Sequence, residues 1–243
     1  MEERMENRVR TYWTQRAHDV GAVREQELHN ELSVRWLAAL ERQLPREKPL
    51  HILDVGTGTG YFCILLARRG HDLTGIDLTP AMIDEARRQA ASEALAVHFC
   101  VMNAQQLDFP DASFDAVISR NLTWTLPDPV QAYREWYRVL KPGGVLLNFD
   151  ADYGSAVRAE SGTRVGGVST AYGHTGMTRA LTEENDAITL SMEISRTVRP
   201  DWDLQTLQSL GFRAVTADRA AGVRILREKD LPAAPIFLIR AEK

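Results

Sequence analysis

Residues 51–62, His-Ile-Leu-Asp-Val-Gly-Thr-Gly-Thr-Gly-Tyr-Phe, constrain the fold more than any other stretch of the chain. The first half is mostly apolar and predicts a short buried strand of a parallel sheet. Gly56, Gly58 and Gly60 then allow a sharp turn and the close approach of a ligand. Thr59 can cap the helix that is predicted to follow. A strand, a glycine turn and a helix in this order predict a ligand site at the carboxyl edge of an open α/β sheet.

The glycine spacing separates this turn from two common phosphate-binding motifs. A dinucleotide fingerprint needs a glycine where this chain has Tyr61, and a phosphate loop needs a lysine after its last glycine. Asp54 instead stands at the end of the strand, directly before the glycines. A carboxylate repels a phosphate at this place, so the turn suits a cationic ligand.

Segment 54–60, Asp-x-Gly-x-Gly-x-Gly, resembles motif I of the class I S-adenosylmethionine (SAM) dependent methyltransferases. In that family the acid of motif I helps to hold the ammonium group of the cofactor's methionine part. Segment 75–79, Gly-Ile-Asp-Leu-Thr, resembles the end of the family's second strand, where an acid binds both ribose hydroxyls. Asp77 also lies about 20 residues beyond the glycine turn, as expected of a ribose-binding acid.

Two later segments continue the resemblance in the family's order. Residues 103–115 hold Asn-Ala and then Leu-x-Phe-x-Asp-x-Ser-Phe-Asp, and resemble the adenine-binding turn and the start of strand four. Residues 138–144, Arg-Val-Leu-Lys-Pro-Gly-Gly, resemble the turn before strand five. Many relatives carry Asp where this chain has Asn103, but Asn can accept a hydrogen bond from the adenine amino group through its carbonyl oxygen. The resemblance covers roughly residues 48–150.

The resemblance implies an α/β, Rossmann-like class I methyltransferase fold with a seven-stranded sheet of order 3-2-1-4-5-7-6. From residue 50 onward, apolar strand patterns alternate with helical patterns, which favours right-handed crossovers and a parallel sheet. We expect a helical cap at 1–48 and a SAM-binding core at 49–243, with an insertion between strands five and six at about 151–200. The core ends with a helix at about 203–210 and strands at about 212–218 and 235–241.

The helical cap is predicted as two helices, at about 2–18 and 23–44, with a break at 19–22 that contains Gly21. Tyr12 and Trp13 form part of an apolar patch among charges on the first helix. This patch either docks the helix on the core or closes the SAM site as a lid, because relatives often use an N-terminal segment in that way. A sulfonium attracts aromatic faces, by about 0.5–2 kcal/mol for each contact. The same helices can instead pair subunits, so we expect a monomer or a homodimer.

The insertion is rich in glycine and lies over the carboxyl edge of the sheet in this fold. It is therefore expected either to recognise the substrate or to form a mobile surface loop. Within it, Tyr172 is a candidate lid or substrate contact, and His174 is a candidate base. A structural or exposed position is the plain alternative for both.

Methyl transfer from a sulfonium is a displacement, in which alignment of the reactants can contribute up to about 7–11 kcal/mol. Arg120, Asn121 and Trp124 follow strand four, beside the methionine half of SAM in this family. Arg120 can bind a carboxylate, Asn121 can fix the substrate or the SAM carboxylate, and Trp124 can flank the sulfonium or lie in the core. Asp150 follows strand five and either deprotonates an amine or serves as a cap or solvated turn.

The candidate site residues fall into two groups. The candidate catalytic residues are Asn121, Asp150, Tyr172 and His174. The resemblance implies cofactor contacts from Tyr12, Trp13, Asp54, Gly56, Thr57, Gly58, Asp77, Leu78, Met82, Asn103, Ala104, Gln105, Arg120, Asn121 and Trp124.

The expected activity is SAM-dependent methyl transfer to a small-molecule acceptor, with S-adenosylhomocysteine (SAH) as product. The alternative on the same fold is cyclisation of SAM to azetidine-2-carboxylate with release of methylthioadenosine. A SAM or SAH sensor without turnover is a further alternative. A nicotinamide-dependent oxidoreductase is disfavoured by Tyr61 and Asp54.

The net charge of −4 argues against a sequence-independent grip on nucleic acid. The amide–Pro-Pro–aromatic motif of DNA-adenine and protein-glutamine methylases is absent from the sequence. The chain has no apolar run long enough to span a bilayer, and its charged start does not resemble a signal peptide. The His, Asp, Glu and Cys residues show no metal-binding spacing. We therefore expect a cytoplasmic enzyme with a small-molecule substrate and with no metal, nucleic-acid or membrane partner.

Overall fold

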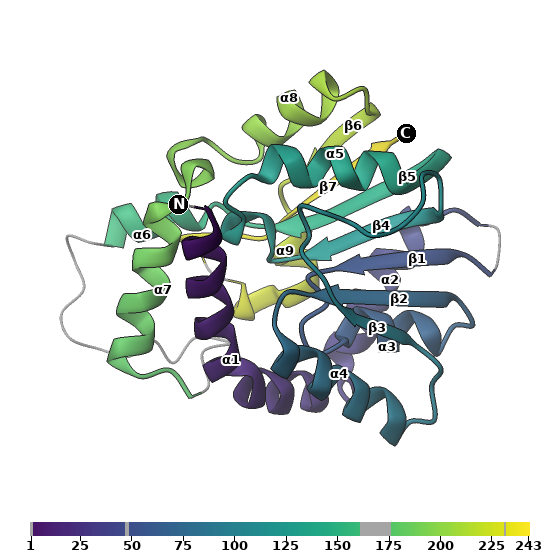
Figure 1. The fold of residues 1–243 in the computed structure, drawn as a ribbon, viewed down its shortest axis with the longest axis horizontal. Coiled ribbons are helices and arrows are strands. Elements are labelled where there is room, and N and C mark those ends of the chain that lie inside the picture. Colours follow the sequence, from purple (N-terminus) through teal and green to yellow (C-terminus); the bar gives the residue numbers. More distant parts are fainter. Residues whose placement is uncertain (1, 47–48, 161–175, 231) are drawn as a thin grey trace.

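A mixed sheet of seven strands organises the chain in a computed structural model, which describes residues 2–46, 49–160, 176–230 and 232–243 (Figure 1). The strand order is β3-β2-β1-β4-β5-β7-β6, in which β7 runs antiparallel to both of its neighbours and the other pairs are parallel. The predicted sheet order and the α/β fold class are therefore confirmed. The strands are β1 (His51–Val55), β2 (Asp72–Asp77), β3 (His98–Val101), β4 (Phe114–Arg120), β5 (Leu140–Asp150), β6 (Arg213–Asp218) and β7 (Phe237–Glu242).

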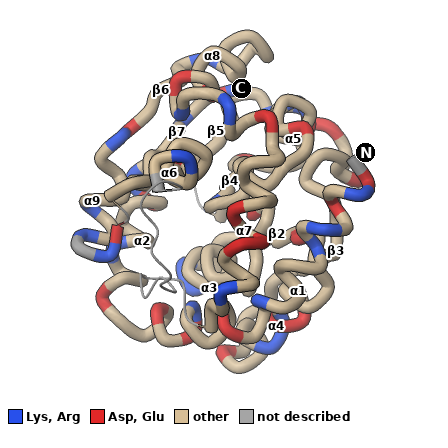
Figure 2. The backbone as a smooth tube through the Cα atoms, turned by 90° about the vertical axis from the view of Figure 1, so that its left-hand side faces the viewer, with Lys and Arg blue, Asp and Glu red and all other residues tan. Residues whose placement is uncertain are grey.

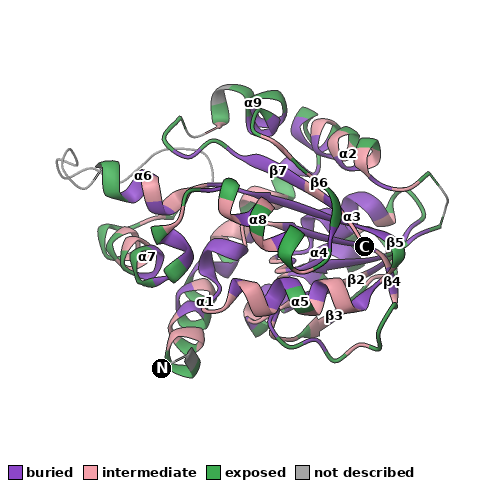
Figure 3. Ribbon diagram, turned by 90° about the horizontal axis from the view of Figure 1, so that it is seen from above, coloured by how far each residue is buried: buried purple, intermediate pink, exposed green. Residues whose placement is uncertain are grey.

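Helices cover both faces of the sheet and bury its apolar side chains (Figure 3). One core cluster joins the sheet to α2, α3, α4 and α9, and the other joins it to α5 and α8. The helices are α1 (Glu2–Glu27), α2 (Glu31–Gln43), α3 (Tyr61–Ala67), α4 (Pro80–Ser92), α5 (Pro129–Val139), α6 (Tyr153–Glu160), α7 (Arg179–Ser191), α8 (Asp201–Ser209) and α9 (Ala221–Leu226). Three short 3-10 turns complete the description, η1 (Thr123–Thr125), η2 (Glu193–Arg196) and η3 (Arg227–Lys229).

The predicted break at 19–22 is wrong, because α1 continues through Gly21 and ends at Glu27. At Gly21 the helix packs closely against α4. The Gln89 side chain donates a hydrogen bond to the Gly21 carbonyl at 3.0 Å, and a Cβ atom at position 21 would lie 3.1 Å from the Glu85 carboxylate. The chain turns instead before α2, where the Asn30 side chain accepts the N–H of Leu32 at 2.8 Å as an N-cap.

The predicted Thr59 cap is also wrong, because Gly60 is the N-cap residue of α3 and no side chain caps this helix. Gly60 has a φ of +81°, which glycine adopts without the strain of a side chain. A Cβ atom here would lie 3.0 Å from both Ala86 and Phe99. The glycine therefore serves the packing of α3 against its neighbours as well as the turn.

The central position of β1 brings the functional segments together. Because β1 pairs in parallel with β2 and β4, the strand ends near Val55, Asp77 and Arg120 meet at one edge of the sheet. Helices α1 and α7 lie side by side beyond this edge (Figure 1). They are joined by a bidentate pair between Arg8 and Glu184, at 2.6 and 2.8 Å. The start of the chain and the segment after residue 176 thus form a wall in front of the sheet edge.

The face beyond the carboxyl edge carries charges of both signs. Over the described residues on this face, Lys and Arg are interspersed with Asp and Glu (Figure 2). Among the described residues, none of the helices is both long and apolar enough to cross a membrane. The described residues also hold no group of three or more His, Cys, Asp or Glu side chains placed to bind a metal ion.

Candidate functional site

A cavity of about 430 Å³ lies between the strand ends and the wall formed by α1 and α7. Its lining comes from the glycine turn, from the ends of β2 and β4, and from the segment around Asn103. Helices α1, α6 and α7 and the segment before β7 line the rest. The structure places all of the predicted cofactor-binding residues along this cavity, and their contact with a cofactor stays a prediction. They are Tyr12, Trp13, Asp54, Gly56, Thr57, Gly58, Asp77, Leu78, Met82, Asn103, Ala104, Gln105, Arg120, Asn121 and Trp124.

Asp54 presents a buried carboxylate at the end of β1, with 2% of the residue exposed. Its Oδ2 accepts a hydrogen bond from the Thr57 hydroxyl at 2.6 Å and a weaker one from the Cys63 thiol at 3.6 Å. Burial raises the pKa of Asp54 to about 6, although these two hydrogen bonds and the nearby Arg120 act in the opposite direction. A cation bound beside this carboxylate would stabilise its charge and so compensate for the hydration that it loses on burial.

Asp77 ties the end of β2 to the glycine turn. Its Oδ2 accepts the N–H of Gly58 at 3.0 Å, and its Oδ1 accepts the N–H of Thr79 at 2.8 Å. Burial raises the pKa of Asp77. Gly58 has a φ of +55°, and a Cβ atom built there would meet nothing within 4 Å. The backbone at Gly58 is therefore open to the cavity, so that a ligand can approach it as a SAM site requires.

A polar cluster lies around Asn103, after β3. The Asn103 Oδ1 accepts the backbone N–H of Gln105 at 2.9 Å. The Asn103 Nδ2 and the Gln105 Nε2 both donate to the Glu6 carboxylate of α1, at 2.7 and 2.8 Å. Glu6 was not predicted as a site residue, because it lies 97 residues before Asn103 in a run of charged residues.

Arg120 ends β4 among aromatic rings. Its guanidinium carbon lies 5.1 Å from the ring centre of Trp36 and 4.8 Å from those of Tyr61 and Phe62. Such cation–π contacts hold the charge in place, at about 0.5–2 kcal/mol each. Trp36 belongs to α2 and is 1% exposed. Its part in supporting Arg120 was not predicted, because helical periodicity marks a residue as core without naming its neighbour.

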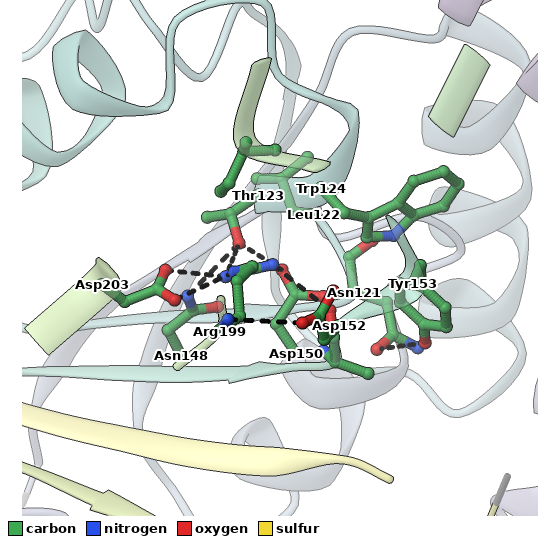
Figure 4. Close-up of polar contacts among 12 residues, drawn as sticks. Asn121, Leu122, Thr123, Trp124, Asn148, Asp150, Asp152, Tyr153, Arg199 and Asp203 are labelled. Carbon is green, nitrogen blue, oxygen red and sulfur yellow. Dashed lines mark hydrogen bonds and ion pairs between the residues drawn. The ribbon is translucent and has the colours of Figure 1, made fainter. Parts of the chain in front are cut away.

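Asn121, Trp124 and Tyr153 come together at the same edge (Figure 4). The Tyr153 hydroxyl donates to the Asn121 side-chain oxygen at 3.1 Å, and the Trp124 indole N–H donates to the Asn121 carbonyl at 3.0 Å. The Trp124 ring lies 5.1 Å from that of Tyr153 and 6.5 Å from that of Trp13. Asn121, a candidate catalytic residue, therefore lines the cavity in a fixed orientation. Tyr153 is an additional cavity residue outside the predicted site.

The structure corrects the expectation for Asp150, which does not line the cavity. Asp150 is fully buried at the end of β5, where its carboxylate pairs with Arg199 at 3.1 Å and accepts the Thr123 hydroxyl (Figure 4). A carboxylate held in this way is a structural anchor and does not face an acceptor. The other two candidate catalytic residues, Tyr172 and His174, lie outside the described residues.

Comparison with known proteins gives a family for the central part of the chain. Residues 53–148 match the family described as "Methyltransferase domain". A demethylmenaquinone methyltransferase from Deinococcus radiodurans is 40% identical over 118 residues, which cover 47% of this chain and 49% of that protein. The chain thus matches about half the length of this curated relative.

Solved structures show the same fold over most of the chain. One is a complex between the Trm112 methyltransferase activator and a candidate methyltransferase from Haloferax volcanii, with a TM-score of 0.65, 19% identity, and coverage of 95% of this chain and 96% of that one. Another is phosphoethanolamine N-methyltransferase 2 of Haemonchus contortus in complex with SAM, with a TM-score of 0.60, 20% identity, and coverage of 85% and 51%. Segment 53–148 therefore matches the methyltransferase-domain family, and the seven-stranded sheet has the order and fold that the resemblance to class I SAM-dependent methyltransferases implied.

Proposed function

We propose that the protein binds SAM in the cavity and transfers its methyl group to a small-molecule acceptor. The observation that carries this proposal is the continuity of the cavity. One end is lined by Asp54, Gly58 and Asp77, and the other by side chains of α1, α6 and α7, among them Tyr12 and Asp186. The volume of about 430 Å³ falls within the usual range for a small-molecule site.

The residues at the first end fit SAM in chemistry and in order. Asp54 offers a carboxylate to the methionine ammonium, and the carboxylate of Asp77 can accept hydrogen bonds from the ribose hydroxyls. Gly58 leaves room between them, and Arg120 places a positive charge where the methionine carboxylate needs a partner. When bound, SAM supplies a methyl group activated by its sulfonium.

Aromatic side chains border the part of the cavity beyond this end. Tyr12, Trp13, Trp124 and Tyr153 all line it. Their rings favour a sulfonium and exclude water from the reacting carbon. Burial raises the pKa of Tyr12 to about 12 and raises that of Tyr153 as well. Both hydroxyls therefore stay protonated near neutral pH, and neither acts as a base.

Several features support a small molecule as the acceptor. The reactive end is enclosed by α1 and α7, which leaves a pocket suited to a small ligand. The charges on the outer face are mixed in sign, whereas a protein surface that binds nucleic acid is dominated by Lys and Arg. The name of the Deinococcus radiodurans relative also points to a small-molecule acceptor for that protein.

The test is an incubation of the purified protein with SAM, first alone and then with a panel of small amines, thiols, phenols and carboxylates, followed by mass spectrometry. The proposal predicts SAH only when an acceptor is present, together with the methylated acceptor. Methylthioadenosine from SAM alone would contradict methyl transfer and support cyclisation of SAM. Tight binding of SAM without any product from a broad panel would contradict turnover and support a sensor.

A further inference from the structure

We propose that Glu6 of α1 recognises the amino group of the cofactor's adenine, in place of the acidic residue that many relatives carry at position 103. This inference rests on the proposed function, because it concerns how the same cavity selects its nucleoside. It assigns a specificity role to a residue of the N-terminal helix.

Asn103 has less hydrogen-bond accepting capacity than an aspartate at the same position. An aspartate in this turn has two oxygens, so that one can accept a backbone N–H while the other accepts the adenine amino group. Asparagine has one oxygen, and in this protein Asn103 Oδ1 accepts both the backbone N–H of Gln105 at 2.9 Å and the Gln105 side-chain amide at 3.5 Å, which occupy its two lone pairs. The other end of the Asn103 side chain is an NH₂ group, which donates and does not accept. The turn itself therefore offers the adenine amino group no second side-chain oxygen from residue 103.

Glu6 places a carboxylate beside Asn103 in the cavity. This residue lines the cavity, and its Oε1 accepts hydrogen bonds from the Asn103 amide at 2.7 Å and from the Gln105 amide at 2.8 Å. Within residues 2–46, 49–160, 176–230 and 232–243, its Oε2 makes no hydrogen bond. Two amide donors thus fix a carboxylate at the adenine end of the cavity and leave one of its oxygens available. That oxygen is an acceptor, which the amino group of adenine requires.

The helix that carries Glu6 also contacts α7. Arg8, two residues further along α1, pairs with Glu184 of α7, and Tyr12 packs in the apolar cluster that joins α1 to α7. Recognition of adenine by Glu6 therefore also favours the position of α1 in which the cavity is covered. Nucleoside selection and closure of the site depend on the same helix.

The variant Glu6→Gln tests this inference. The glutamine oxygen can still accept from the Asn103 and Gln105 amides, while the group in place of Oε2 becomes an NH₂ donor. The two ligands to compare by calorimetry are SAH and S-inosylhomocysteine, whose base carries an oxo group in place of the amino group. We expect the parent to bind SAH about tenfold to a hundredfold more tightly than the inosine analogue. Glu6→Gln should lose or reverse this preference. Its NH₂ group cannot accept a hydrogen bond from the amino group of adenine, but it can donate one to the oxo group of inosine.

Two further variants separate recognition from a merely structural role. Glu3→Gln removes the same charge from an exposed position of α1 and should keep the parent's preference. Glu6→Gln combined with Asn103→Asp returns a second carboxylate oxygen to the turn and should restore preference for SAH. Equal weakening of both ligands in Glu6→Gln, or an unchanged preference, would overturn this inference while leaving the proposed function intact. Failure of the parent to bind either nucleoside would overturn both.

Discussion

The guanidinium of Arg199 lies 3.1 Å from the carboxylate of Asp150, and both residues are buried. This pair joins the end of β5 to the segment that leads into α8. Arg199 also pairs with Asp203 at 2.7 Å and donates to the Thr123 hydroxyl at 2.7 Å (Figure 4). Thr123 follows Asn121 and Leu122, which line the cavity, in the loop after β4. The network therefore holds this wall of the cavity in place, although its own side chains do not line the cavity.

Replacement of Arg199 by methionine should destabilise the protein but spare its cofactor site. Arg199→Met leaves two buried carboxylates without their cation, and breaking such a pair costs about 3–5 kcal/mol. Urea unfolding should show this loss, while the folded variant should bind SAH within about threefold of the parent's affinity, a difference below 1 kcal/mol. Arg196→Met, at an exposed position nearby, should change the free energy of unfolding by less than about 0.5 kcal/mol. An Arg199→Met variant as stable as the parent would contradict the role given to this network.

The pKa of Asp54 predicts a pH dependence for cofactor binding. Burial raises this pKa to about 6, and only the carboxylate form attracts the ammonium of SAH. Protons therefore compete with the ligand, so that the dissociation constant should rise as the pH falls, by up to about tenfold for each unit below pH 6. Calorimetry between about pH 5 and pH 7 measures this rise. Asp54→Asn should bind weakly with little dependence on pH, and an equally flat profile in the parent would contradict the assignment.

The same shift has the opposite consequence for the ligand-free protein. A carboxyl group whose pKa is higher in the folded state than in the unfolded state makes folding less favourable as it ionises. The contribution of Asp54 to the free energy of unfolding should therefore fall as the pH rises from its ordinary pKa of 3.8 to about 6. Thermal unfolding of the parent and of Asp54→Asn over this range should differ with that sign.

Loss of the Asp77 carboxylate should weaken SAH binding by about 2–4 kcal/mol, because charged hydrogen bonds to the ribose disappear and leave ligand groups unpaired. Asp77→Ala also removes the acceptor of the Gly58 N–H. Asp72→Ala, at the exposed start of the same strand, is the matched control and should bind like the parent. Calorimetry distinguishes the two variants. Parent-like binding by Asp77→Ala would mean that the ribose lies elsewhere.

A lid role for the wall of α1 and α7 predicts a kinetic effect of the ion pair between Arg8 and Glu184. Their side chains are 37% and 38% exposed, so the pair contributes less than about 1 kcal/mol to the equilibrium. Arg8→Glu and Glu184→Arg should each speed the release of SAH several-fold, since like charges then separate α1 from α7. The double variant should restore slow release. Stopped-flow fluorescence from Trp13 and Trp124 can follow this step, and a double variant as fast as the single ones would contradict a lid formed by α1 and α7.

The residues whose position at the carboxyl edge of the sheet was predicted correctly belong to short segments. Asp54 and Gly58 lie within one strand and turn, and Asp77 ends the next strand, so local pattern and sheet topology place all three at one edge. Residues whose roles depend on distant partners were misread. Gly21 was expected to break a helix, but it packs against α4. Asp150 was a candidate base or a cap or solvated turn, but it is buried against Arg199, which comes much later in the chain.

The central claim is that the turn at Gly58 holds a SAM-type nucleoside, and calorimetric titration with SAH tests it most directly. Gly58 and Gly70 both have a positive φ, and a Cβ atom at either meets nothing within 4 Å, but only Gly58 lines the cavity. Valine at either position therefore brings similar backbone strain, and only Gly58→Val fills the ligand's place. We expect the parent and Gly70→Val to bind SAH alike, and Gly58→Val to lose at least about a hundredfold in affinity. No binding to the parent, or equal binding by Gly58→Val, would contradict the account.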